Sequence, residues 1–245
     1  MQMKILQLNI WGGKLDKNLI DLLRREEADV LCLQEVVHLP GSHSVFFADL
    51  EEIQQSAGYD YVHFTPSYEC NFMHRTMSWG NAVLSRQPFV ETKKLYTYLE
   101  KVENFDRTIH TDYNAGRVLQ HVVIKTEKTP LHVLNHHGYH INSHKNGDNE
   151  TIRQCGMIAD YVKKLEGLVV LCGDFNLVGN CQSIEQINSV LINHVNKNNV
   201  TSTRTPLTHK SEACDFIFTS PEIEVQNFQV LDDIASDHKA LVVEF

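Results

Sequence analysis

Polar residues that suit metal and phosphate chemistry adjoin several apolar, strand-like runs of this sequence. They are Asn9, Glu35, Asp174, Asn176, Asp215, Asp237 and His238. Strand ends that converge are where α/β enzymes collect catalytic groups. Carboxylates are hard oxygen ligands for Mg²⁺ or Mn²⁺, amides supply neutral hydrogen bonds, and a histidine can take a proton from water. The set therefore predicts metal-assisted attack of water on a phosphate ester.

The most specific segment is Gly-Asp-Phe-Asn at 173–176, which directly follows an apolar run of five residues. Gly173 permits a tight backbone turn. Asp174 and Asn176 lie two residues apart on an extended chain, so their side chains project to the same side. We expect the pair to orient the attacking water, one as an anionic acceptor and the other as an amide that fixes the water or binds phosphate.

Two further carboxylates and a histidine complete the expected centre. His238 has an ordinary pKa near working pH and is predicted to act as the base, with Asp215 fixing its tautomer. Glu35 ends an apolar strand, where a divalent ion makes the buried charge tolerable, so we expect it to be a metal ligand. Asn9 ends a similar strand and is expected to hold the metal's water shell or the phosphate.

Five histidines between positions 132 and 144 raise the alternative of a zinc site: His132, His136, His137, His140 and His144. Their spacing does not match a HExxH helix, and the run 131–134 looks like a strand. We interpret His137, at the end of that run, as a phosphate contact, and His140 and His144 as exposed loop residues. Arg117 is either a phosphate clamp or an ordinary surface arginine.

Charge and cysteine content narrow the class of protein. The 22 basic and 31 acidic residues give a net charge of −9, which argues against a tight, unspecific grip on long DNA. The 6 cysteines show no CxxC pair, as expected for reduced, mostly buried thiols. We see no signal peptide or membrane span in the sequence, and we expect a cytoplasmic monomer with no integral membrane association.

The hydrophobic pattern predicts one α/β domain over residues 1–245, with two mixed sheets packed face to face and helices outside. Strands are expected at 4–8, 30–33, 59–64, 81–84, 95–98, 118–124, 131–134, 168–172, 216–219, 225–231 and 239–244. Helices are expected at 15–25, 46–56, 150–165 and 183–193, the last beginning at a capping box of Ser183 and Gln186. The stretches 65–79 and 100–116 are expected to be irregular loops.

The ordered segments resemble the endonuclease/exonuclease/phosphatase superfamily, which includes deoxyribonuclease I-like enzymes. The resemblance rests on Asn9, Leu-Gln-Glu at 33–35, Gly-Asp-Phe-Asn at 173–176, Asp-Phe-Ile-Phe at 215–218 and Ser-Asp-His at 236–238. It implies a four-layer α/β sandwich and a magnesium-dependent phosphoesterase. It also implies that Glu35 is the metal carboxylate with Asn9 as its neighbour, that Asp237 is a second acidic group near the metal, and that His137 stabilises the phosphate.

Further positions follow from the same resemblance. The segment 79–85 resembles a family strand, which suggests Trp79 and Asn81 as substrate-binding residues beside Arg117. Trp11 and His137 depart from the residues of abasic-site enzymes, so that branch is disfavoured. We expect a nuclease or a DNA-end-processing phosphodiesterase whose partner is a nucleic-acid phosphate ester. The alternative is a sphingomyelinase-like phospholipid phosphoesterase or an inositol-phosphate phosphoesterase.

Overall fold

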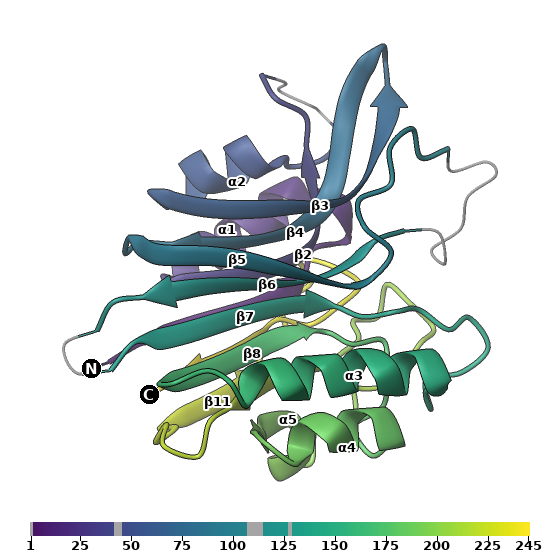
Figure 1. Cartoon of the computed structure of the whole chain (residues 1–245). Coiled ribbons are helices and arrows are strands. Elements are labelled where there is room, and N and C mark those ends of the chain that lie inside the picture. Colours follow the sequence, from purple (N-terminus) through teal and green to yellow (C-terminus); the bar gives the residue numbers. More distant parts are fainter. Residues whose placement is uncertain (1, 42–45, 107–114, 127–128) are drawn as a thin grey trace.

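Two six-stranded β-sheets form the centre of the molecule, which a computed structural model describes over residues 2–41, 46–106, 115–126 and 129–245 (Figure 1). The first sheet has the order β11-β12-β1-β2-β4-β3. Its strands are β1 (Lys4–Asn9), β2 (Val30–His38), β3 (Tyr61–Phe72), β4 (Arg75–Ser85), β11 (Asn227–Val230) and β12 (Leu241–Glu244). Strand β1 pairs with β2 in parallel and with β12 antiparallel, so the sheet is mixed.

The second sheet has the order β5-β6-β7-β8-β10-β9. Its strands are β5 (Phe89–Tyr98), β6 (Arg117–Ile124), β7 (Leu131–His137), β8 (Leu168–Asp174), β9 (Ile192–Asn193) and β10 (Asp215–Thr219). Strands β7 and β8 are parallel, and β8 pairs with β10 antiparallel. Both central strands are buried along almost their whole length, as expected for strands covered on two faces.

Helices cover the outer face of each sheet and complete four layers, as the sequence predicts. Figure 1 shows α1 (Asp16–Glu26) and α2 (Leu50–Ala57) on one side, and α3 (Asn149–Val162), α4 (Gln182–Asn188) and α5 (His194–Lys197) on the other. Helix α1 buries Leu19, Ile20, Leu22 and Leu23 against the first sheet. Helix α3 begins at a capping box in which the Asp148 carboxylate accepts from the Thr151 amide at 2.9 Å. The four-layer α/β sandwich is confirmed.

The stretch 65–79 is not the irregular loop that we expected. It forms most of a long hairpin of β3 and β4 that extends beyond the rest of its sheet (Figure 1). Phe72 pairs with Arg75, so the turn consists of Met73 and His74, which have φ angles of 49° and 63°. No glycine marks this turn, and for that reason the sequence pattern misses it. Of the other expected loop, residues 107–114 lie outside the described residues.

The helix expected at 183–193 is shorter and begins differently. Cys181 is its N-cap, and α4 ends at Asn188, after which residues 192–193 form β9. The Ser183 hydroxyl bonds the Thr151 hydroxyl at 2.9 Å, so it serves helix–helix contact and not capping. The capping-box prediction was wrong because the Ser183 hydroxyl bonds Thr151 of α3 instead of capping its own helix.

A ladder of buried amide side chains joins the two sheets. Gln34 Nε2 donates to Asn135 Oδ1 at 2.7 Å, and Asn135 Nδ2 donates to Gln120 Oε1 at 3.0 Å. Gln7 Nε2 donates to Gln34 Oε1 at 2.9 Å. All four side chains are fully buried, and a polar network of this kind favours one register between the sheets.

Two further expectations concern the state of the cysteines and the presence of membrane-spanning helices. All six cysteines are free and buried, as predicted. In the part of the chain that the structure describes, no helix is long and apolar enough to cross a membrane.

Candidate active site

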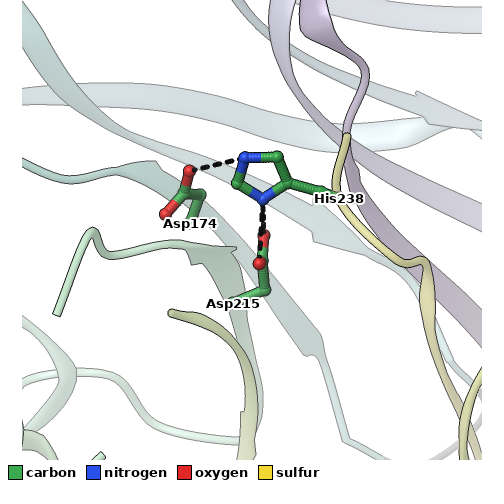
Figure 2. A group of neighbouring side chains, drawn as sticks. All are labelled: Asp174, Asp215 and His238. Atoms are coloured by element: carbon green, nitrogen blue, oxygen red, sulfur yellow. Dashed lines mark hydrogen bonds and ion pairs between the residues drawn. The ribbon is translucent and has the colours of Figure 1, made fainter. Parts of the chain in front are cut away.

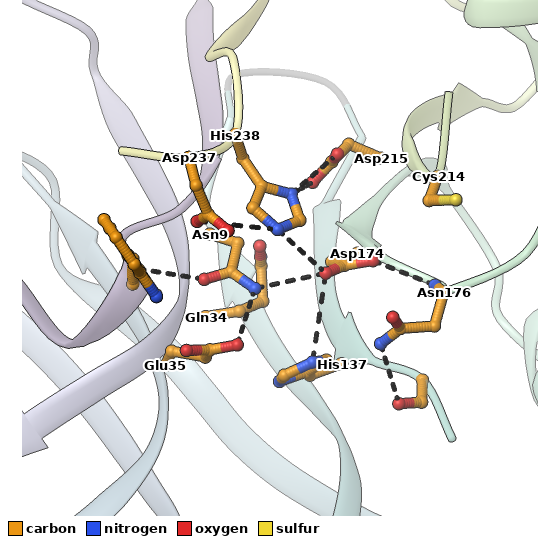
Figure 3. A network of polar contacts seen from close by, with 12 residues as sticks. Asn9, Gln34, Glu35, His137, Asp174, Asn176, Cys214, Asp215, Asp237 and His238 are labelled. Carbon is orange, nitrogen blue, oxygen red and sulfur yellow. Dashed lines mark hydrogen bonds and ion pairs between the residues drawn. The ribbon is translucent and has the colours of Figure 1, made fainter. Parts of the chain in front are cut away.

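The predicted polar residues meet at one edge of the sandwich, around a cleft of about 250 Å³. The cleft is lined by six of the expected catalytic and metal-binding residues and by the three expected substrate contacts: Glu35, His137, Asp174, Asn176, Asp237, His238, Arg117, Asn81 and Trp79. Asn9 and Asp215 lie directly behind this lining, with at most 1% of each residue exposed. The catalytic and metal-binding residues named from the sequence therefore lie together in one network (Figure 3).

The first part of the site is a histidine held by a buried carboxylate. His238 Nδ1 lies 2.9 Å from Asp215 Oδ2 and 3.0 Å from Asp215 Oδ1 (Figure 2). Asp215 also accepts from Thr203 Oγ1 at 2.6 Å and from Gln7 Nε2 at 3.2 Å. These bonds fix the carboxylate, and the carboxylate in turn fixes the imidazole ring.

The second part is Asp174, which stands between the two histidines. Its Oδ2 lies 3.6 Å from His238 Nε2 and 3.9 Å from His137 Nε2. The backbone of Asn176 donates to Oδ1 at 2.9 Å, which closes the tight turn after β8. Gly173 lies directly opposite His136, and a side chain there would meet the His136 carbonyl at 2.0 Å. Close approach of β7 and β8 therefore places His137 next to Asp174.

The third part joins Asn9 to Glu35. Asn9 Nδ2 donates to Glu35 Oε1 at 3.0 Å and to Asp174 Oδ2 at 3.1 Å. Its Oδ1 accepts from the Trp11 backbone at 3.0 Å, which sets the orientation of the amide. Glu35 has φ of 55° at a β-bulge between Leu33 and Val36, and this irregularity turns its carboxylate to the cleft.

Burial and charge shift several pKa values in the site. Burial raises the pKa of Glu35, and the Asn9 hydrogen bond only partly offsets this. Burial also acts to raise the pKa of Asp174, but His238, Arg204 and His137 lower it, and the lowering dominates. Burial acts to lower the pKa of His238, but Asp215 and Asp174 hold it above its ordinary value. Burial and then Arg117 lower the pKa of His137, which keeps that imidazole neutral.

The donor set fits a hard divalent cation at Glu35 and Asp237. Both carboxylates line the cleft, and Asp237 further raises the pKa of Glu35, so a cation between them relieves like-charge repulsion. Asp174, Asp215 and His238 offer atoms within 4.8 Å of one another, but their nearest atoms already bond one another (Figure 2). The carboxylates that remain for such a cation are those of Glu35 and Asp237, and Asn9 adjoins Glu35.

The walls of the cleft carry the expected substrate contacts. Arg117 is only 5% exposed, so the alternative of a surface arginine was wrong. Asn81 is buried, and no hydrogen-bond partner of its Oδ1 lies among the described residues. Trp79 stacks on Tyr68 with ring centroids 6.0 Å apart. His140, expected on an exposed loop, is half-buried and also lines the cleft.

Two cationic residues were missed by sequence reasoning. Lys145 Nζ donates to Asn176 Oδ1 at 3.0 Å, and Arg204 Nη1 donates to His238 Nε2. Both side chains are more than nine-tenths buried. They lie in connecting segments without a motif. The polar run Thr-Ser-Thr-Arg-Thr at 201–205, shortly before the Asp215 strand, was the only available signal.

Comparison with known proteins agrees with this geometry. The sequence profile described as the Endonuclease/Exonuclease/phosphatase family matches residues 6–238. The chain belongs to this family. The family resemblance drawn from the five short segments is therefore confirmed, and the chain shares the phosphoesterase fold of the Endonuclease/Exonuclease/phosphatase family.

Individual relatives and solved structures share a low sequence identity with this chain. The uncharacterized protein YbhP of Escherichia coli K12 is 28% identical over 186 residues, which cover 71% of this chain and 66% of YbhP. An Endonuclease/Exonuclease/phosphatase family protein from Bacteroides thetaiotaomicron has a TM-score of 0.75 at 17% identity, covering 100% of this chain and 97% of that one. The mannosyl-6-phosphatase of the same organism has a TM-score of 0.70 at 16% identity, with 98% of each chain covered. At these identities the structures show a shared fold.

Proposed function

We propose that the protein is a metal-dependent phosphodiesterase that uses Mg²⁺ or Mn²⁺ and acts on nucleic acid, as a nuclease or a DNA-end-processing enzyme. The observation that carries the proposal is that the His238–Asp215 pair shares one cleft with the carboxylates of Glu35 and Asp237. A base held by a carboxylate, beside a place for a divalent cation, suits attack of water on phosphorus.

The hydrogen bonds define the roles of the residues at the base. Nδ1 of His238 donates to Asp215, so Nε2 carries the lone pair that accepts a proton from water. Asp174, whose lowered pKa keeps it ionised, lies 3.6 Å from that nitrogen and accepts from the same water. Asn176 presents its amide to the cleft while Lys145 holds its oxygen.

A second group of residues in the cleft receives the phosphate. A bound Mg²⁺ or Mn²⁺ would neutralise charge on the phosphate oxygens, with Glu35 and Asp237 as its carboxylate ligands and Asn9 beside them. Neutral His137 donates an N–H to a phosphate oxygen, and Asn81 and Arg117 hold the remaining oxygens. These donors are fixed in advance by strands, Arg117 and His137 at the ends of β6 and β7 and Asn81 within β4.

The net charge of the protein and the aromatic residues of the cleft support a nucleic-acid substrate whose terminus enters the cleft. With a net charge of −9, the protein lacks the basic surplus of proteins that bind long duplexes. Trp11, Tyr68 and Trp79 line the cleft and offer flat surfaces on which a terminal base can stack. A phospholipid or inositol-phosphate substrate is the second candidate. The likeness in fold to a mannosyl-6-phosphatase favours it, since that protein's name gives a sugar phosphate as substrate.

A substrate panel with one variant tests the proposal. Purified protein is assayed on bis-p-nitrophenyl phosphate, single- and double-stranded DNA, RNA, 5′-tyrosyl DNA, sphingomyelin and inositol phosphates, with Mg²⁺, Mn²⁺ or excess EDTA. We expect hydrolysis that chelation abolishes and either metal restores. Glu35→Gln should remove most of it with the fold intact, whereas the exposed Glu91→Gln should not. Full activity in EDTA would refute the metal role.

A further inference from the structure

Arg204 is the cation nearest to the expected base, and the backbone on both sides of it is fixed. The Thr203 carbonyl accepts from the Lys239 amide at 2.8 Å, and the Thr205 amide donates to the Asp237 carbonyl at 3.1 Å. The segment therefore runs antiparallel to residues 237–239, with Arg204 directly opposite His238. The side chain lines the cleft although only 6% of the residue is exposed.

The donors of Arg204 are only partly used. A guanidinium carries five N–H donors and no acceptor. Nη1 donates to His238 Nε2, and Nε is buried with no hydrogen-bond partner among the described residues. Within the same part of the chain, Arg204 forms no salt bridge with a carboxylate. Burial opposes its charge, but Asp174, Asp215 and Asp237 nearby keep its pKa raised. A buried, permanently charged fork therefore faces a cleft in which we expect phosphate.

The position of Nη1 has a direct consequence for the base. An arginine can only donate, so the lone pair of His238 Nε2 points at the guanidinium in the free protein. That lone pair is the one that must accept a proton from water. Arg204 and the attacking water thus require the same site on the imidazole. Nonbridging phosphate oxygens are stronger acceptors for a guanidinium than a neutral ring nitrogen.

We propose that Arg204 binds nonbridging oxygens of the substrate phosphate and that this binding draws it off His238 Nε2, which frees the base only when a phosphate is in place. The inference rests on the proposed function for the role of His238. The phosphate contact can be tested without catalysis. The ligand class is any phosphate group, whether from a nucleotide end, a lipid headgroup or inorganic phosphate.

Two variants and a control separate the effect of the Arg204 charge from that of its planar shape. Arg204→Met removes the charge at similar volume, Arg204→Lys keeps the charge without the planar fork, and Arg24→Met removes an arginine on the exposed face of α1. Affinity for inorganic phosphate is measured by calorimetry with and without Mg²⁺. Circular dichroism and thermal melting show whether each variant is folded, and Arg204→Lys serves if Arg204→Met does not fold.

The second measurement follows the histidine itself. The ¹⁵N resonance of His238 Nε2, assigned by comparison with His238→Gln, is recorded during titration with inorganic phosphate in metal-free protein. We expect it to shift in the wild type and in Arg24→Met. In Arg204→Met it should already be displaced before phosphate is added and should respond little.

The outcomes decide the inference. Arg204→Met should weaken phosphate binding at least tenfold, with KM for an active ester rising in parallel and Arg204→Lys in between. If Arg204→Met binds phosphate with an affinity within twofold of the wild type, the proposal that Arg204 binds the phosphate is refuted. If the His238 Nε2 resonance of the wild type does not shift when phosphate is added, the proposal that phosphate draws Arg204 off His238 is refuted. A protein that binds phosphate in this way but hydrolyses no ester would refute the proposed function and leave the Arg204 contact standing.

Discussion

At the scale of single residues, the site depends on side chains that hold one another in place. Asp215 receives bonds from Thr203, Gln7 and His238, and none of its neighbours lies at the surface. Its role is to fix the tautomer and the orientation of the ring, so its effect on rate should appear only through His238.

Asp215→Asn and His238→Ala should therefore each reduce the rate by roughly 10²–10⁴-fold, the usual range for a general base. The double variant should be scarcely slower than the slower single variant, because parts of one catalytic unit do not add. Single-turnover rates on one ester test this, with metal affinity as the control, which should change little. Multiplicative losses would show that the two side chains act independently.

Lys145 is the residue for which we expect a positioning effect. Burial lowers its pKa, and its amine donates to Asn176 Oδ1 at 3.0 Å. Lys145→Met should lower kcat about tenfold with little change in KM, since one hydrogen bond to a charged donor contributes about 1.5–3 kcal/mol at most. The exposed Lys163→Met is the matched control. A change confined to KM would instead indicate that Lys145 contacts the substrate.

Sequence reasoning found the polar residues that adjoin apolar runs and missed two that lie within long polar connections. Asn9 and Asp174 are the last residues of β1 and β8, and the apolar runs before them are visible without a structure. Glu35 was expected to end its strand but lies within β2, at the bulge, with buried Val36 and Val37 after it. Arg204 and Lys145 reach the site only because long connections fold back over it, and the direction of such a connection is set by tertiary contacts. The same holds for the inter-sheet amides, whose burial no local pattern reveals.

At the scale of elements, the clearest difference between sequence and structure is the β3–β4 hairpin. Its strands contain polar residues at several positions because the hairpin extends beyond the sheet and is only partly buried. The alternation of polar and apolar residues that marks a half-buried strand is therefore weak in this segment. The turn residues Met73 and His74 both have positive φ without being glycine or asparagine.

Replacing the turn by Asn-Gly should stabilise the protein. The double substitution Met73→Asn, His74→Gly places residues that favour positive φ at both central positions of a two-residue hairpin turn. We expect the free energy of unfolding to rise by about 1 kcal/mol, measured by urea denaturation. The reverse order, Met73→Gly with His74→Asn, controls for composition and should gain less. A loss of stability would mean that the Met73 or His74 side chain makes a contact that outweighs the strain.

At the scale of the whole molecule, buried neutral histidines set the response to acid. Burial lowers the pKa of His121 and of His194 to about 4 each. Both are nearly inaccessible, and His194 Nε2 lies 2.8 Å from the Thr219 hydroxyl. An unfolded chain protonates them near pH 6.5, so the unfolded state binds more protons below that value.

Their contribution to stability should be complete above about pH 6.5 and decline as the pH falls toward 4, by on the order of 1–3 kcal/mol for each histidine. Chemical denaturation at several pH values in that window tests this. His194→Gln should flatten the decline, and the exposed His144→Gln should not. An unchanged slope in His194→Gln would show that His194 is not the group that titrates.

The order of the strands has a consequence for how this molecule can be recombined with its relatives. In the described part of the chain, strands β5 to β10 make up the second sheet and are consecutive in sequence, between Ser85 at the end of β4 and β11 of the first sheet. Exchanging residues 89–219 between two such chains would transplant His137, Asp174 and Asp215 together, while Asn9, Glu35 and His238 stay with the recipient. A chimera would be active only if the contacts between the two sheets still match, among them those of the resident Gln34 with the incoming Asn135 and of the resident Gln7 and His238 with the incoming Asp215. A library of such exchanges should sort into active and inactive members by how well these cross-sheet contacts match.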